Sequence, residues 1–213
     1  MAKIALIGAT GFVGAAVLKE AVSRGHTVTA LARNTDKVEK LDNVTAVKTD
    51  VFDTDALAKQ LAGHDIVISA FNPGWTDANI RENHIKGSRS INAAAKKAGV
   101  KRLIAVGGAG SLEINGQQLV DSPEFPADWK EGALGARQAL NELREENELD
   151  WTFVSPAIML EPGERTGKYR LGADQPVFDE KGESKISVDD LAVAIIDEAE
   201  QGKHIGKRFT AAY

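Results

Sequence analysis

Three glycines near the start of the chain are spaced for a tight backbone turn that leads into a helix. They stand in the segment Gly8-Ala9-Thr10-Gly11-Phe12-Val13-Gly14. Residues 3–7 before it form an apolar run suited to a buried parallel strand, and residues 15–22 after it have helical character. Free N–H groups at the N-terminus of a helix can bind a pyrophosphate. This order of strand, glycine turn and helix therefore predicts a dinucleotide site.

Each glycine of the turn has a separate expected role. Gly8 permits the tight turn, Gly11 allows a phosphate to approach the backbone, and Gly14 lets the helix pack closely on the strand. Together with Thr10 and Phe12, these glycines are expected to hold the pyrophosphate. In a purely structural alternative, the glycines only close a turn and cap a helix.

Arg33 directly follows the next expected strand, residues 27–32. At this position of a dinucleotide-binding fold, an acidic residue accepts hydrogen bonds from the adenosine ribose, whereas an arginine can pair with a 2′-phosphate. Arg33 therefore favours NADP(H) over NAD(H). The alternative is an ordinary surface arginine in a loop.

Strands and helices alternate along the chain, as a doubly wound α/β fold requires. The expected strands are residues 3–7, 27–32, 44–48, 65–69, 102–106, 151–154 and 207–210. The expected helices are residues 15–22, 56–61, 77–98, 131–143 and 188–200. We predict a Rossmann-like, doubly wound parallel sheet of six or seven strands. Residues 1–213 are expected to form one domain, with residues 156–187 as a small C-terminal substrate lobe and residues 115–129 as a loop.

Composition excludes several classes of function. The 213 residues carry a net charge of -5, which argues against a nucleic-acid surface, and no cysteine, which excludes disulfides and thiolate chemistry. The four histidines lack the spacing of a helical zinc site, so we expect no metal. No apolar run is long enough to cross a membrane, and a strand follows almost directly after Met1. We therefore expect a cytoplasmic protein without a membrane partner, either a monomer or a homodimer.

Several short segments together carry a resemblance to known families. The GxxGxxG form of the glycine turn resembles the short-chain dehydrogenase/reductase superfamily, especially its extended and atypical branches. With SPA at 155–157, PGERTGKYRLG at 162–172, SKISVDDLAVAIIDE at 184–198 and RFT at 208–210, the chain resembles the NmrA-like NAD(P)H-binding proteins described as NADH-flavin reductases. These are relatives of the biliverdin reductase B/flavin reductase group. The resemblance covers essentially the whole chain.

The resemblance implies roles for residues on the adenine side of the site. Asp50 and Val51, which follow the strand at 44–48, would border the adenine, although a plain turn aspartate is the alternative. The small side chain of Ala70 would let the cofactor pass the sheet edge, with Phe71 beside it.

On the nicotinamide side, the resemblance points to two further segments. Gly107 is expected to bind the cofactor and begins the glycine-rich segment in which the superfamily carries its active-site serine or threonine. Ser111 in this segment therefore becomes a candidate catalytic hydroxyl. The alternative is that Ser111 only caps a turn. Pro156 and Ile158 would orient the nicotinamide. Ser111 is expected to steady the acceptor without being indispensable.

One part of the superfamily's pattern is missing. Members that oxidise alcohols or reduce ketones carry Tyr-x-x-x-Lys on the helix after the fifth strand, where the lysine lowers the pKa of the tyrosine. The expected helix at 131–143 has neither residue, and the only tyrosines are Tyr169 and Tyr213. A sugar-nucleotide epimerase is therefore disfavoured. Two functions fit: hydride transfer from NADPH to a free flavin or quinone-like small-molecule acceptor, or binding of NADP(H) without turnover, as in a redox sensor.

The other noteworthy polar residues have structural explanations. His84, on the expected helix at 77–98, is interpreted as a partly buried, hydrogen-bonded histidine and not as a catalyst. Ser187 is a good N-cap for the last helix. Arg165, Thr166 and Tyr169 either shape an acceptor pocket or pin the C-terminal lobe, and the sequence leaves both possibilities open.

Overall fold

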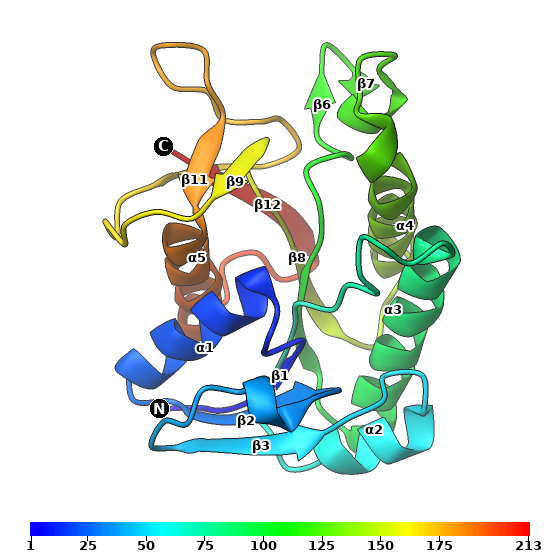
Figure 1. Ribbon diagram of the computed structural model, residues 1–213, viewed down its shortest axis with the longest axis vertical. Coiled ribbons are helices and arrows are strands. Elements are labelled where there is room, and N and C mark those ends of the chain that lie inside the picture. The colour runs from blue at the N-terminus through cyan, green and yellow to red at the C-terminus, as the bar shows by residue number, and fades with distance from the viewer.

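Eight strands form one sheet in the computed structural model, which describes residues 1–213 (Figure 1). Along the sheet the strands are β10 (Arg170–Gly172), β12 (Lys207–Ala212), β8 (Asp150–Ser155), β5 (Arg102–Val106), β4 (Ile66–Ser69), β1 (Lys3–Ile7), β2 (Thr27–Ala32) and β3 (Val44–Lys48). All neighbours are parallel except β10, which is antiparallel to β12. The predicted Rossmann-like sheet is confirmed with seven parallel strands, and β10 is an additional edge strand.

The central strands are buried on both faces because helices cover the sheet on both sides. All four residues of β4 are buried, as are four of the five in β1, and both strands read as continuous apolar runs. β1 lies between β2 and β4, so the strand order reverses there. In open α/β sheets such a reversal opens a crevice at the carboxyl ends of the strands, where ligands bind.

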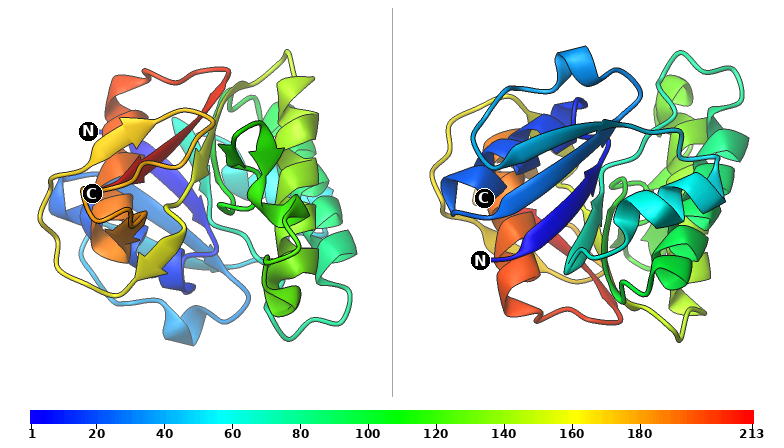
Figure 2. Two further views of the ribbon diagram at one scale, coloured as in Figure 1. Left: turned by 90° about the horizontal axis from the view of Figure 1, so that it is seen from above. Right: turned by 90° about the horizontal axis from the view of Figure 1, so that it is seen from below.

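Five helices pack on the sheet (Figure 2). α1 (Phe12–Ser23) and α5 (Val188–Gln201) lie on one face, and α2 (Thr54–Leu61), α3 (Ile80–Ala98) and α4 (Ala127–Arg144) lie on the other. The predicted N-cap of α5 is confirmed, because the Ser187 hydroxyl accepts from the Asp190 N–H. At the start of α2, the Asp53 carboxylate accepts from the Ala56 N–H. None of the helices is long and apolar enough to span a membrane.

The expected loop at 115–129 is wrong in part. β6 (Glu113–Ile114) and β7 (Gln117–Gln118) form a hairpin around Asn115 and Gly116, whose φ angles are 53° and 79°. These positive φ values suit the Asn-Gly turn that connects short hairpins. A short 3₁₀ turn, η2 (Leu119–Asp121), follows, and α4 already begins at Ala127 because Pro126 stands in its N-cap position.

The segment predicted to form the C-terminal lobe contains two short parallel strands, β9 (Met159–Glu161) and β11 (Lys185–Ser187). Between them, Arg165 binds the buried carboxylate of Glu20 on α1, with N–O distances of 2.7 and 2.9 Å. Thr166 donates to Asp190 at 2.6 Å, and the Tyr169 hydroxyl donates to Asp197. Of the two possibilities that the sequence leaves open, the contacts favour pinning of the lobe to α1 and α5.

Candidate functional site

The turn between β1 and α1 is built so tightly that two of its glycines are required by the chain itself. Gly8 has a φ of 77°, and a Cβ there would lie 2.6 Å from the carbonyl oxygen of Ala70. A Cβ on Gly14 would lie 1.9 Å from the carbonyl oxygen of Gly8. These contacts agree with the predicted roles of Gly8 in the turn and of Gly14 in helix packing.

Gly11 differs, because nothing in the fold requires a glycine there. Its φ is −76°, and an added Cβ would only reach ordinary contact with the Gly8 carbonyl oxygen, at 3.5 Å. Gly11 is the exposed N-cap of α1, and no side chain caps this helix. The first turn of α1 also lacks an acidic residue. The N–H groups in the first turn of α1 therefore have no partner from a side chain, which suits them to an external anion. The missing side chain at Gly11 gives such an anion room to approach.

Thr10 and Phe12 flank this bare position. Thr10 is half-buried, whereas the Phe12 side chain is 52 % exposed at the first residue of α1. Thr10 lies within the glycine turn and Phe12 begins α1, and their contact with a pyrophosphate stays a prediction.

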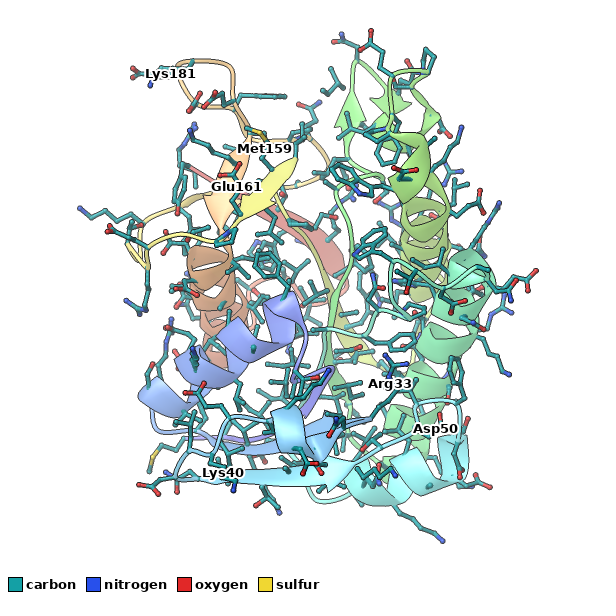
Figure 3. The ribbon with its side chains drawn as sticks, in the orientation of Figure 1. Arg33, Lys40, Asp50, Met159, Glu161 and Lys181 are labelled. Carbon is teal, nitrogen blue, oxygen red and sulfur yellow. The ribbon has the colours of Figure 1, made fainter.

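An open hollow of about 490 Å³ lies at the ends of β2 and β3, where the adenosine end of a dinucleotide is expected. Arg33 and Asp50 both line it, and Figure 3 shows them at this edge of the sheet. The Asp50 carboxylate accepts from the Phe52 N–H at 2.9 Å, so it also holds the turn before α2. Arg33 is exposed and enters no salt bridge of the chain, which leaves its guanidinium free for an anion.

Lys48 lines the same hollow and was missed by the sequence interpretation. It pairs with Ala32 across β2 and β3, so it stands next to the residue before Arg33. The sequence did contain a signal for this position, because Lys48 is the last residue of the expected strand 44–48. Val51 lies farther inside, where its carbonyl accepts from the Ser90 hydroxyl and its side chain packs on the α2 and α3 side of the sheet.

Ala70 and Phe71 follow β4 and have separate surroundings. Ala70 contacts the glycine turn through its backbone, since its carbonyl oxygen is the group closest to a Cβ at Gly8. The Phe71 ring instead packs against Gly87 of α3, where an added Cβ would lie 2.2 Å from the ring.

The segments after β5 and β8 form the opposite side of the switch point. A Cβ on Gly107 would lie 1.9 Å from the Phe153 ring, so core packing alone requires this glycine. Pro156 is buried, and the Ile158 side chain is 41 % exposed. The Ile158 N–H donates to the Ser184 hydroxyl at 3.3 Å, so a nicotinamide would have to share or displace this contact.

Ser111 lies in the glycine-rich segment after β5 and is only 3 % exposed. Its hydroxyl accepts from Nη1 of Arg208 at 2.8 Å. Arg208 belongs to the RFT segment of β12, 97 positions away, and no local sequence signal indicated this pairing. Ser111 thus lies at the predicted edge of the sheet, and its hydroxyl oxygen already accepts one hydrogen bond, from Arg208.

Neither tyrosine is free to act as a proton donor. Burial and the hydrogen bond to the Asp197 carboxylate raise the pKa of Tyr169 well above its usual range. The Tyr213 hydroxyl donates to Asp190 at 2.6 Å. α4 begins earlier than expected and so includes Lys130, but it contains no tyrosine.

His84 of α3 is buried against α4, more completely than the partial burial that was predicted. It is 6 % exposed, its Nδ1 lies 3.4 Å from the Ser88 hydroxyl, and it lines a small cavity of about 20 Å³. Burial lowers the pKa of His84 to about 4, so the ring is neutral at pH 7.

Comparisons with known proteins agree with this geometry. A family model described as NAD(P)H-binding matches residues 8–201. The "Uncharacterized protein YwnB" of Bacillus subtilis is 39 % identical over 212 residues, which are 98 % of this chain and 97 % of YwnB. The structure of a "putative epimerase" from Bacteroides thetaiotaomicron is 46 % identical, with a TM-score of 0.93 over 100 % of this chain and 97 % of that one. A "putative NADH-flavin reductase" from Streptococcus pneumoniae is 38 % identical, with a TM-score of 0.86 over 100 % and 99 % of the two chains.

Proposed function

This chain belongs to the NAD(P)H-binding family, and from that membership we propose that it is a reductase that passes a hydride from NADPH to a free flavin or quinone-like acceptor. The main observation in favour of cofactor binding concerns Gly11. It is the one glycine of the turn that the fold does not need, at a helix N-terminus without a side-chain cap. A pyrophosphate explains both features.

The choice of a flavin or quinone-like acceptor follows from the lack of a suitable proton donor. Both tyrosine hydroxyls are engaged with carboxylates, so no Tyr–Lys pair is available to protonate an alkoxide. Flavins and quinones suit such a site, because their reduced forms can take a proton from water. The structural neighbour described as a "putative NADH-flavin reductase" supports the same acceptor class.

The chain's own residues would bind and orient the two reactants. The N–H groups of α1 hold the pyrophosphate, Arg33 pairs with the 2′-phosphate, and the backbone at Pro156 and Ile158 orients the nicotinamide. When bound, NADPH supplies the hydride. Residues 156–187 form the acceptor side, and catalysis comes mainly from holding the reacting atoms about 3 to 3.5 Å apart.

Removing the guanidinium of Arg33 tests the cofactor preference. We expect Arg33→Ala to weaken NADP⁺ binding by roughly ten- to a hundredfold and NAD⁺ binding by less than about twofold, because only NADP⁺ carries the 2′-phosphate. Calorimetric titration with each cofactor measures both constants without turnover. Arg89→Ala, which removes an exposed arginine bound to Glu142, is the matched control and should change neither. If Arg33→Ala weakened NADP⁺ and NAD⁺ binding equally, Arg33 would not be the residue that binds the 2′-phosphate.

The reaction itself is tested by the loss of NADPH absorbance when the purified, cofactor-free protein is mixed with FMN, riboflavin or a simple quinone. We expect turnover well above the uncatalysed rate with at least one of them, and slower turnover with NADH. The absence of turnover in a sample that binds NADPH tightly would contradict the reductase.

A non-catalytic NADP(H) sensor is the second candidate. The engagement of both tyrosines and the 3 % exposure of Ser111 favour it, because they leave few polar groups accessible to a substrate. A sensor should bind NADP⁺ and NADPH without consuming either.

A further inference from the structure

Phe52 is an exposed aromatic residue at the hollow that Arg33 and Asp50 also line. It follows β3 in the turn before α2, and its side chain is 39 % exposed. Of the eight residues that line this hollow, Phe52 is the one aromatic residue. A purine base is flat and has a π-face on either side, so an exposed phenyl ring beside an open hollow offers it a surface for stacking.

The turn fixes the backbone on both sides of Phe52. The Asp50 carboxylate accepts from the Phe52 N–H at 2.9 Å, and the Asp53 N–H donates to the Asp50 carbonyl at 3.2 Å. The Asp53 carboxylate in turn accepts from the Ala56 N–H at 3.1 Å, at the start of α2. Phe52 is therefore presented by an ordered turn, although part of its side chain lies in solvent.

Two neighbours hold the Phe52 ring itself. The centre of the Phe71 ring lies 6.1 Å from that of Phe52, and the two ring planes meet at 87°. Phe71 is itself fixed by its packing against Gly87 of α3. Nζ of Lys86, also on α3, lies 5.3 Å from the centre of the Phe52 ring, within the range of a cation–π contact. The ring is thus oriented before a ligand binds, which lowers the entropic cost of stacking on it.

Val51 is the apolar residue that the resemblance assigns to the adenine, but its side chain has other surroundings. It is not among the residues that line the hollow, and it packs on the apolar cluster at the α2 and α3 side of the sheet. The hollow therefore offers a base the side chain of Phe52 and not that of Val51.

We propose that the adenine of the cofactor stacks on the ring of Phe52. The inference rests on the cofactor site of the proposed function and adds the residue that recognises the base. Stacking depends on the flat purine, which NADP(H) and NAD(H) share, and not on the 2′-phosphate. Phe52 therefore contributes equally to the binding of both cofactors, whereas Arg33 separates them.

The binding of the two cofactors tests the stacking without turnover. We expect Phe52→Ala to weaken NADP⁺ and NAD⁺ binding by the same factor, about five- to twentyfold, because both lose one base–ring contact. Phe52→Tyr keeps the ring and should bind both within about twofold of the parent. Phe52→Leu keeps apolar volume but has no aromatic face, so it should stay at least about threefold weaker than the parent. Calorimetric titration measures each constant.

Phe178→Ala is the matched control. Phe178 is 40 % exposed, close to the value for Phe52, but it lies between β10 and β11 and does not line the hollow. Its removal should change neither cofactor constant by more than about twofold. Thermal unfolding of every variant separates a lost contact from a loss of folded protein.

Nuclear magnetic resonance detects the stacked base directly. In the complex with adenosine 2′,5′-bisphosphate, we expect nuclear Overhauser contacts between the adenine protons and the ring protons of Phe52. They should be absent in Phe52→Leu. Reduced nicotinamide mononucleotide has no adenine and is the matched probe, so Phe52→Ala should bind it as the parent does.

Unchanged NADP⁺ and NAD⁺ affinities in Phe52→Ala would overturn the inference, as would a loss confined to NADP⁺ or parent-like affinities in Phe52→Leu. A parent protein that binds neither cofactor would overturn both the stacking and the proposed cofactor site. The proposed reductase fails separately: equal losses in Phe52→Ala, in a protein that shows no turnover, support the stacking and contradict the reductase. Turnover by the parent, with unchanged affinities in Phe52→Ala, supports the reductase and contradicts the stacking.

Discussion

Gly11→Asp should abolish cofactor binding while leaving the protein as stable as its parent, or slightly more stable. The fold has room for the new Cβ, which would lie 3.5 Å from the nearest atom. Aspartate is a preferred N-cap, and its charge is favourable at a helix N-terminus. For the pyrophosphate, the same carboxylate is a like charge at close range. At about 4 Å and an effective dielectric constant of about 20, the repulsion is about 4 kcal/mol, or roughly a thousandfold in affinity.

Calorimetric titration with NADPH and thermal unfolding of the same sample measure the two effects. Gly14→Ala is the informative contrast, because its Cβ would lie 1.9 Å from the Gly8 carbonyl oxygen. We expect that variant to lose stability first and binding only as a consequence. Tight NADPH binding by a folded Gly11→Asp protein would place the pyrophosphate somewhere other than the N-terminus of α1.

The sequence was most informative where local pattern and tertiary structure impose the same requirement. β1 and β4 are short apolar runs, and their burial in the middle of a parallel sheet is what such runs predict. Ser187 was identifiable as an N-cap because the residues after it have helical periodicity. The positions of Arg33 and Asp50 at one sheet edge also followed, since the carboxyl ends of neighbouring parallel strands lie together.

The sequence could not separate glycines that the chain needs from glycines that leave room for a ligand. Gly107 was assigned to the cofactor site, yet the Phe153 ring alone requires it, whereas nothing within the fold requires Gly11. This difference depends on which atoms surround the missing Cβ, and those atoms come from distant strands. The contact between Arg208 and Ser111 has the same origin, because it forms only after β12 has paired with β8.

Acid should destabilise the protein through His84 well before most carboxylates titrate. An exposed histidine in the unfolded chain has a pKa near 6.5, and burial lowers the pKa of His84 in the folded protein to about 4. Between these values the unfolded state binds more protons than the folded state, so stability falls as the pH falls. From pH 7 to pH 5 this single group should remove roughly 2 kcal/mol of unfolding free energy. Denaturant unfolding at pH 7, 6 and 5 measures it in the parent and in His84→Gln, whose stability should depend less on pH by that amount.

The loss of stability caused by His84 occurs at a higher pH than the loss caused by protonation of the buried carboxylates. Arg165 holds the pKa of Glu20 below its usual value, so the stabilisation by that carboxylate is lost only below about pH 4.5. Ile91→Val is the matched control, because Ile91 lines the same small cavity as His84 and carries no titratable group. It should cost about 1 kcal/mol at every pH, whereas His84→Gln should change the slope. If the two variants gave parallel curves between pH 7 and 5, the neutral burial of His84 would not be the source of the acid sensitivity.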